Sequence, residues 1–263
     1  MILCIDIGNS HLFGGVFKQD KLQLRFRYDS RNTSTSDQLG IFLKSVLREN
    51  HINPDEIQKI AICSVVPSID YSIRSACKKY FDIDPFMLQA GVKTGLKIKY
   101  RNPVEVGADR IANAIAAVER YPNQNIIVID FGTGTTLCAI TANKEYLGGA
   151  IHPGFRLSSE ALQNGTAKLS SVEIIKPSTL IGRSTTESIQ SGLFYGQLGL
   201  VKELTQRIHQ EKLFDTPAVL LATGGFSQLF SQEKLFDAII PDLALYGLKK
   251  ALSLNENMST MTA

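Results

Sequence analysis

Two stretches of the chain share one pattern, in which an apolar run ends at an aspartate and a short polar turn follows. In residues 2–17 the run meets Asp6, and in residues 126–141 it meets Asp130. Each stretch predicts a strand, a tight turn and a second strand, because glycine and asparagine after the aspartate are typical turn formers. The two aspartates lie close to half the chain apart, so the repeat predicts two similar domains rather than a solenoid.

Other elements follow from the same reading. The periodicity predicts strands at 59–66, 96–100, 137–141, 146–151 and 218–222 and helices at 68–80, from about Gly107 to Val118 and from Ser184 on. A capping box from Ser184 to Glu187 is expected at the last of these starts. The polar turn at 121–125 separates the halves, which predicts domains at 1–117 and 118–263, with a frayed tail at 255–263.

Composition narrows the class of protein. The 263 residues are 44% hydrophobic and 20% charged with a net charge of +3, which is typical of a globular protein and gives no electrostatic support for binding nucleic acid or a membrane surface. Neither a secretory signal nor an apolar run of membrane-spanning length is evident, so we expect a cytoplasmic protein. The four cysteines form no CxxC pair and are expected to be buried, reduced thiols.

The glycines after Asp130 raise the question of a nucleotide site. A dinucleotide fingerprint is rejected, because Leu137 stands at the third glycine position and a strand follows where a helix is required. A Walker A motif is absent. The alternatives are a plain turn or a hairpin whose backbone N–H groups bind phosphate, helped by the hydroxyls of Ser10, Thr133, Thr135 and Thr136. Since the hairpin occurs twice, we favour an ATP site, with a strand-end aspartate near Mg²⁺.

Asp109 and Arg110 stand at a predicted helix start. The helix dipole explains an aspartate there and would keep it ionised and only weakly basic, but the dipole disfavours an arginine. Arg110 is better explained by an acidic ligand that it binds through two hydrogen bonds. The pair therefore predicts an acceptor substrate that carries a carboxylate and places a hydroxyl near Asp109. Tyr100 and Thr185 are weaker candidates, for which a core tyrosine and a surface threonine are the alternatives.

Four segments resemble the motifs of type III pantothenate kinases and occur in that family's order along nearly the whole chain. They are residues 6–10, 107–110, 130–135 and 148–154. The family belongs to the actin, sugar-kinase and Hsp70-like superfamily. The resemblance implies an α/β fold of two ribonuclease-H-like domains, each a mixed five-stranded sheet flanked by helices, with a nucleotide cleft between them.

The resemblance also implies the activity and the residues that perform it. ATP would phosphorylate the terminal hydroxyl of pantothenate to give 4'-phosphopantothenate, the first step of coenzyme A synthesis, with Asp109 as general base. Asp130 would hold a monovalent cation, K⁺ or NH₄⁺, and Asp6 would lie near Mg²⁺, directly or through water. The implied ATP contacts are Asp6, Ile7, Gly8, Asn9, Ser10, His11, Leu12, Phe13 and Thr133. The implied pantothenate contacts are Tyr100, Gly107, Ala108, Asp109, Arg110 and Thr185.

Family members form homodimers, so a homodimer is implied here as well. Two positions depart from the family's pattern. The first motif ends in Asn9-Ser10, where Asn-Thr is common, and the family's Gly-Lys-Asn-Thr reads Gly-Arg-Ser-Thr at 182–185. Both departures keep a hydroxyl or a helix-capping side chain.

Two other readings stay open at this stage. One is a kinase of the same superfamily that acts on a sugar or a short acid. The pair Asp109 and Arg110 favours an anionic acceptor over a neutral sugar. The other is an ATP-binding regulator without catalysis, since some members of the family were first described as accessory factors for gene expression. Loss of the base would favour that reading, but Asp109 is present.

Overall fold

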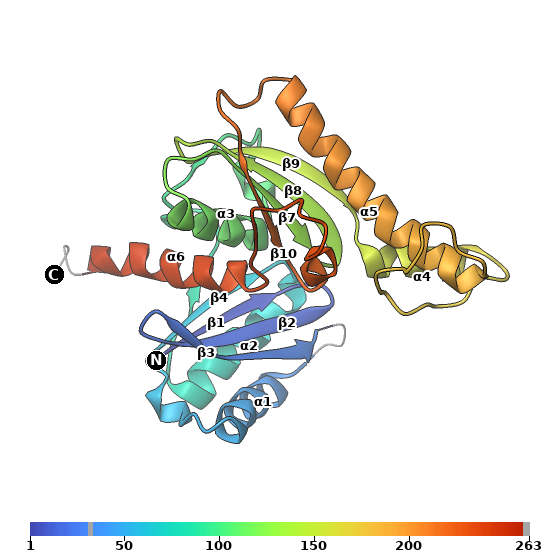
Figure 1. Ribbon diagram of the computed structural model, residues 1–263. Coiled ribbons are helices and arrows are strands. Elements are labelled where there is room, and N and C mark those ends of the chain that lie inside the picture. The colour runs from blue at the N-terminus through green and yellow to red at the C-terminus, as the bar shows by residue number, and fades with distance from the viewer. Residues whose placement is uncertain (31–33, 260–263) are drawn as a thin grey trace. The chain divides into compact units, whose positions relative to one another are not determined.

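The computed structural model describes residues 1–30 and 34–259 (Figure 1). The strands are β1 (Ile2–Ile7), β2 (His11–Lys18), β3 (Lys21–Asp29), β4 (Lys59–Ser64), β5 (Phe86–Met87), β6 (Lys97–Ile98), β7 (Ile126–Phe131), β8 (Gly134–Ile140), β9 (Glu145–Pro153), β10 (Val219–Thr223) and β11 (Ala238–Ile239). The α-helices are α1 (Ser36–Glu49), α2 (Pro67–Phe81), α3 (Ala108–Arg120), α4 (Phe155–Gly165), α5 (Thr185–Gln210) and α6 (Leu243–Ser259). Within the described ranges, no helix combines the length and apolar character needed to cross a membrane.

The predicted repeat is present as two sheets with the same topology. The first sheet has the order β3-β2-β1-β4-β5, and the second has β11-β10-β7-β8-β9-β6. In both sheets a three-stranded antiparallel meander is followed by strands parallel to the first strand of that meander. The second sheet differs from the expected five strands, because β6 pairs parallel with β9 at its edge. This strand is shorter than predicted from residues 96–100.

The chain divides into two compact units. Unit 1 comprises residues 1–96, 100–116 and the segment from Leu243 on, and unit 2 comprises 97–99 and 117–242. The change at Ala116–Ala117 lies beside the predicted boundary, although it falls within α3 and not at a linker. The sequence-based division assigns the last segment to the second domain, whereas α6 packs on β1 and β4 in unit 1. Its helix also continues to Ser259, well into the tail that was expected to be frayed.

Unit 1 buries both faces of its sheet. On one face, Leu3, Ile5 and Ile7 of β1 pack with α1 and α2 in a core that also includes Leu39 and Ile73. These two helices lie together on one side of the first sheet in Figure 1. Because side chains alternate along a strand, Cys4 and Asp6 point to the other face. There α6 contacts β1 and β4 and buries four of its five leucines, Leu243, Leu245, Leu248 and Leu252.

Unit 2 packs its sheet against α5. The buried residues of this helix, among them Leu193, Phe194 and Val201, contact the sheet core formed by Ile127 and Ile129. Four further phenylalanines, Phe131, Phe155, Phe230 and Phe236, form contacts between their rings in the same core. The end of the strand that carries Asp130 is therefore embedded in a rigid apolar cluster.

The contact between α6 and α3 positions the start of α3. A Cβ atom at Gly247 would overlap the carbonyl oxygen of Ala112. We therefore expect Gly247→Ala to separate the two helices and to lower the free energy of unfolding by about 1–3 kcal/mol, the usual cost of overpacking. Urea denaturation measures this change. Gly165→Ala is the control, because Gly165 has open space around its Cα, and a loss of similar size there would contradict the packing explanation.

Candidate active site

The first hairpin, residues 6–13, holds eight of the nine residues that the resemblance assigns to ATP. Its turn is closed by the N–H of Gly8, which donates to the carbonyl of His11 at 3.0 Å. Ser30, which follows β3, fixes the turn. Its Oγ donates to the Gly8 carbonyl at 2.6 Å and its N–H donates to the Ser10 carbonyl at 3.2 Å. The hairpin backbone is thus held rigidly, as a phosphate site requires.

The members of this hairpin differ in what they can offer a ligand. Asn9 is exposed and Ser10 is partly exposed, so their side chains can reach a bound molecule. Ile7 and Leu12 are fully buried in the core of unit 1 and can contribute only backbone atoms. Phe13 is covered by Arg27, whose guanidinium carbon lies 4.6 Å from the ring centroid.

Cys63 is a site residue that the sequence reading missed. It was interpreted as a small buried hydrophobe, and it is buried, but β1 and β4 pair in a register that sets Cys63 beside Asp6. Its thiol donates to Oδ1 of Asp6 at 3.1 Å. Burial raises the pKa of the Cys63 thiol well above its usual range, and the charges of Asp6 and Asp109 raise it further. The thiol therefore stays protonated and remains a donor to Asp6.

Asp109 begins α3 as predicted, but its electrostatics differ from the expectation. Oδ1 accepts the backbone N–H of Arg110 at 2.8 Å, and a Cβ at Gly107 would overlap this oxygen. Burial raises the pKa of the carboxyl, while the N–H bond and the charge of Arg110 lower it and do not compensate. The sequence argument considered only the helix start, which keeps an aspartate ionised and weakly basic, whereas burial acts on the pKa in the opposite direction. Arg110 is itself buried, and Tyr100 is partly exposed just after β6.

The second hairpin carries Asp130 and Thr133. Asp130 lies next to the end of β7 and packs against two glycines. A Cβ at Gly224 would overlap its Oδ1, and a Cβ at Gly132 would lie 3.3 Å from that oxygen. Gly224 also has a φ of +87°, which other residues rarely adopt. The carbonyl of Thr133 accepts the N–H of Gly154 at 3.1 Å. This turn is therefore fixed by β10 on one side and by the end of β9 on the other.

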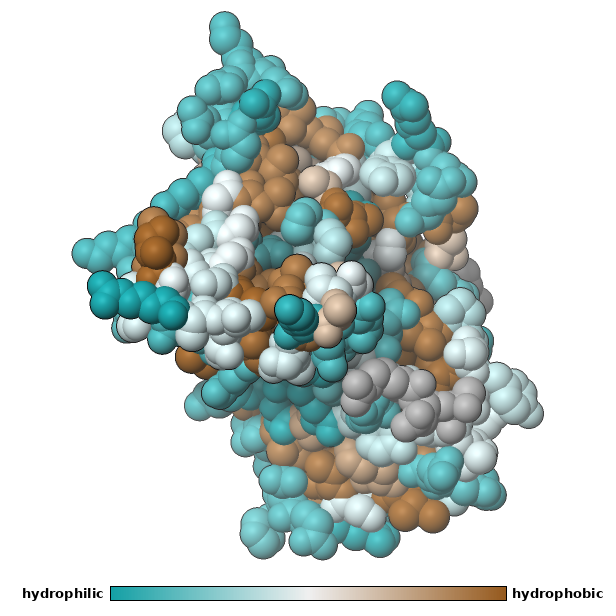
Figure 2. All heavy atoms as spheres, turned by 90° about the vertical axis from the view of Figure 1, so that its right-hand side faces the viewer, coloured by the Kyte–Doolittle hydropathy of each residue, from teal (hydrophilic) through white to brown (hydrophobic). Residues whose placement is uncertain are grey.

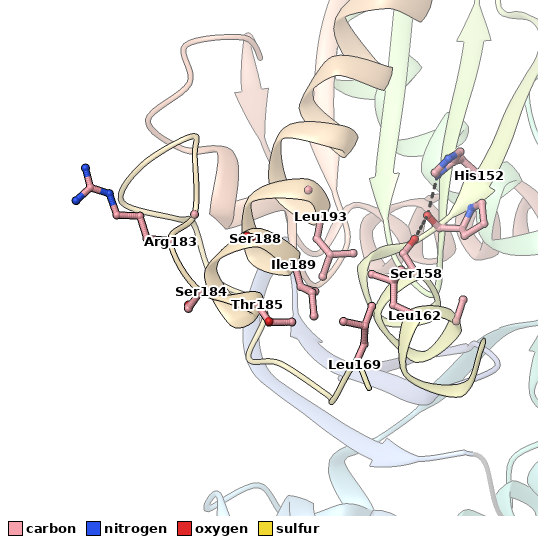
Figure 3. Close-up of a pocket in the computed structure, with 14 residues that line it drawn as sticks. His152, Ser158, Leu162, Leu169, Arg183, Ser184, Thr185, Ser188, Ile189 and Leu193 are labelled. Carbon is pink, nitrogen blue, oxygen red and sulfur yellow. Dashed lines mark hydrogen bonds between the residues drawn. The ribbon is translucent and has the colours of Figure 1, made fainter. Parts of the chain in front are cut away.

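Thr185 lies in an open groove of about 1100 Å³ in unit 2 (Figure 3). The groove is lined by α4, the start of α5 and the residues around His152. Ser184 caps α5 as predicted, accepting the N–H of Glu187 at 3.2 Å. The reciprocal half of the capping box is absent, because the carboxylate of Glu187 accepts the N–H of Arg183 at 2.6 Å instead. The first turn of α5 is thus well fixed, and Thr185 contributes its hydroxyl to the groove.

The structure brings two of the predicted aspartates together in unit 1 and places the predicted residues of unit 2 at two separate locations. Unit 1 brings together Asp6, Cys63 and Asp109, and unit 2 contains Asp130 and Thr133 at a strand end and Thr185 in the groove. Among the described residues, no group of three or more His, Cys, Asp or Glu side chains could hold a metal by itself. Asp6 as a single carboxylate fits Mg²⁺ that is bound mainly by nucleotide phosphates and water.

The raised pKa of Asp109 predicts that the free energy of unfolding depends on pH. Above about pH 3.9, where an aspartate of the unfolded chain ionises, the native state still holds the proton, so stability falls as pH rises through the window up to the native pKa. At pH values above the native pKa, Asp109 is charged in both states, and the loss in the free energy of unfolding is complete and no longer changes with pH. We expect Asp109→Asn to be more stable than the native chain in urea at pH 7.5, with the difference vanishing near pH 3.

Asp37 is the matched control for this effect. It also lies in the first turn of a helix, but hydrogen bonds from Lys79 and Tyr80 lower its pKa. Asp37→Asn should therefore not raise the free energy of unfolding at pH 7.5. The interpretation of Asp109 is wrong if its asparagine variant is less stable than the native chain at neutral pH.

Comparison with known proteins identifies the family. A family model described as type III pantothenate kinase matches residues 2–207. A type III pantothenate kinase of Legionella pneumophila is 67% identical over 255 residues, which cover 97% of this chain and 99% of the relative.

Solved structures show the same fold at lower identity. A Campylobacter jejuni protein assigned to the Baf family of transcriptional activators has a TM-score of 0.60 at 20% identity, over 97% of this chain and 99% of that one. A Sinorhizobium meliloti protein assigned as a 2-dehydro-3-deoxygalactonokinase has a TM-score of 0.56 at 13% identity, over 96% of both chains. These structures concern the fold alone. The family model and the relative that is 67% identical show that the chain belongs to the type III pantothenate kinase family.

Proposed function

We propose that this chain transfers the γ-phosphoryl group of ATP to the terminal hydroxyl of pantothenate and so forms 4'-phosphopantothenate, the first intermediate of coenzyme A synthesis. The observation that carries the proposal is the match to pantothenate kinases over 97% of the chain, together with a partly buried aspartate, Asp109, beside the buried Arg110 at a helix start. A cytoplasmic location is part of the proposal, and cell fractionation tests it.

Asp109 acts as the general base. It accepts the proton of the pantothenate hydroxyl while that oxygen bonds to the γ-phosphorus and the bond from phosphorus to the bridging oxygen breaks. Burial makes this carboxylate more basic than an exposed one. The missing Cβ at Gly107 leaves space beside Oδ1. Phosphoryl transfer through a loose transition state requires mainly orientation, so a moderately basic carboxylate suffices.

The first hairpin binds the ATP phosphates through its backbone N–H groups and the side chains of Asn9 and Ser10. Thr133 of the second hairpin adds a further ATP contact. When bound, Mg²⁺ would be held near Asp6 and would neutralise charge on the phosphates. The support for this arrangement is the pair of equivalent, rigidly held turns, each preceded by an aspartate.

Pantothenate binds at the start of α3, around Asp109 and Arg110. The guanidinium of Arg110 pairs with the pantothenate carboxylate, and the backbone of residues 107–108 approaches it closely because Gly107 has no side chain. Tyr100 and Thr185 contribute hydroxyls. Asp130 holds the monovalent cation, K⁺ or NH₄⁺, which would balance phosphate charge; the tight packing of Gly132 and Gly224 around its carboxylate supports a site of limited size.

Phosphorylation of pantothenate by the purified protein tests this proposal. We expect turnover with MgATP in K⁺ or NH₄⁺ buffer, little in Na⁺ buffer, and a kcat that falls about 10²- to 10⁴-fold in Asp109→Asn, as for loss of a general base. Asp37→Asn is the control and should keep native kcat, since Asp37 is an exposed partner of Lys79. If native protein binds ATP but leaves pantothenate unchanged in K⁺, the substrate is wrong and other hydroxy acids become the candidates.

The chain is proposed to act as a homodimer through unit 2. Large hydrophobic side chains are exposed on and around α4 and the loop before α5, and Figure 2 shows hydrophobic atoms reaching the surface on this side. They are Ile151, Leu157, Leu162, Ile175, Leu180 and Ile181. A concentration of exposed apolar side chains of this kind is typical of an interaction surface.

Sedimentation velocity tests the dimer. We expect a dimer for the native chain and a monomer for the double variant Leu180→Asp/Ile181→Asp, because two charges at an apolar interface lose their hydration. Tyr71→Asp is the matched control, since Tyr71 is an exposed aromatic residue of unit 1, and it should remain dimeric. A native monomer at micromolar concentration, or a dimer that survives the double substitution, would contradict this surface.

A further inference from the structure

Three hydrogen-bond donors converge on one backbone carbonyl, that of Pro153 at the end of β9. Nε2 of Gln197 lies 2.8 Å from this oxygen, Nδ1 of His152 also lies 2.8 Å from it, and Oγ of Ser158 lies 3.3 Å from it. Figure 3 shows the bonds from His152 and Ser158 at the wall of the groove. A carbonyl oxygen has two lone pairs, so three donors hold this short segment more firmly than strand pairing alone requires.

Among the three donors, Gln197 stands at a position where packing alone would favour an apolar residue. It lies on α5 among Phe194, Leu198 and Val201, all buried, and only 3% of Gln197 is exposed. Burying an amide in such surroundings costs free energy unless its hydrogen bonds are made. Nε2 makes its bond to Pro153, but Oε1 is buried and has no hydrogen-bond partner among the described residues. A methionine would fill the same space without this cost, so the glutamine is there for its donor.

The segment that Gln197 holds is in direct contact with the Thr133 turn. Pro153 pairs with Gly134 in the β8–β9 ladder, and the N–H of Gly154 donates to the carbonyl of Thr133. Gly154 lies so close that a Cβ there would overlap the Thr133 carbonyl. Any movement of residues 153–154 would therefore be transmitted to the backbone of Thr133.

We infer that Gln197 is a positioning residue that fixes the Thr133 turn through the Pro153 carbonyl, and that this connects α5 to the ATP contact of the second hairpin. The assignment of an ATP contact to Thr133 rests on the proposed function. The connection consists of contacts within unit 2: α5, Gln197 Nε2, the Pro153 carbonyl, the Gly154 N–H and the Thr133 carbonyl. Because α5 begins at Thr185, the helix that lines the groove also holds the turn.

Gln197→Met tests the inference, because it removes the donor and keeps the volume. We expect hydrogen exchange of the Gly154 amide to become about three- to tenfold faster and the KM for ATP to rise by about the same factor, as for loss of one neutral hydrogen bond. The KM for pantothenate and the urea midpoint should stay native or the midpoint should rise. A structural role alone would lower the midpoint without separating the two KM values.

Gln190→Met is the matched control. Gln190 lies on the same helix and donates to the carbonyl of Glu173 at 3.0 Å, away from the Thr133 turn, so neither exchange at Gly154 nor the KM for ATP should change. His152→Ala is a second variant that removes another donor to the same oxygen from an exposed side chain, and it should speed exchange at Gly154 in the same direction.

The outcomes separate this inference from the proposed function. Exchange at Gly154 is measured without substrate, so it decides the positioning role even if the native protein does not phosphorylate pantothenate. Native exchange at Gly154 in both Gln197→Met and His152→Ala would overturn the inference. Faster exchange with an unchanged KM for ATP, in a native enzyme that is active, would show that the Thr133 turn is held by Gln197 but does not contact ATP, and would overturn the link to ATP.

Discussion

Two aspartates of the site, Asp109 and Asp130, depend on the same constraint. Each packs a carboxylate oxygen closely against the backbone of a glycine. Asp109 lies against Gly107, and Asp130 lies against Gly224 and Gly132. Because these glycines have no side chain, a carboxylate oxygen can lie directly against the backbone. Placement at the end of a strand or at the start of a helix then provides rigidity, because the preceding residues are held in a sheet or a core.

The two units use the same topology for different chemistry. In each, the strand-end aspartate is paired in register with a residue on the neighbouring parallel strand, Cys63 beside Asp6 and Thr223 beside Asp130. After these partners the chains diverge: Ser64 and Val65 follow in unit 1, while unit 2 turns sharply at Gly224. Asp6 therefore has a buried thiol donor at its side, whereas Asp130 is bordered by glycine backbone, which suits the different cations proposed for them.

The sequence predicted the parts of the site that depend on local order. Both hairpins and the start of α3 follow from residues within a few positions of each other, so turn formers and helical spacing were sufficient. Contacts between distant segments could not be read in this way. The bond from Cys63 to Asp6 depends on the register of β1 with β4, the raised pKa of Asp109 depends on burial by the folded unit, and the place of α6 depends on where its leucine face packs. Gln197 could have been noticed as a polar residue within an apolar helix face.

The return of α6 to unit 1 has a consequence for the order in which the molecule assembles. The strands of the first sheet leave the ribosome early, but the face that carries Cys4 and Ala61 is covered by α6, which is synthesised after residues 117–242. Residues 117–242 contain nearly all of unit 2 and emerge before that cover exists. Unit 2 can thus complete its core first. Until α6 is made, one apolar face of the first sheet stays exposed and can bind chaperones or associate prematurely.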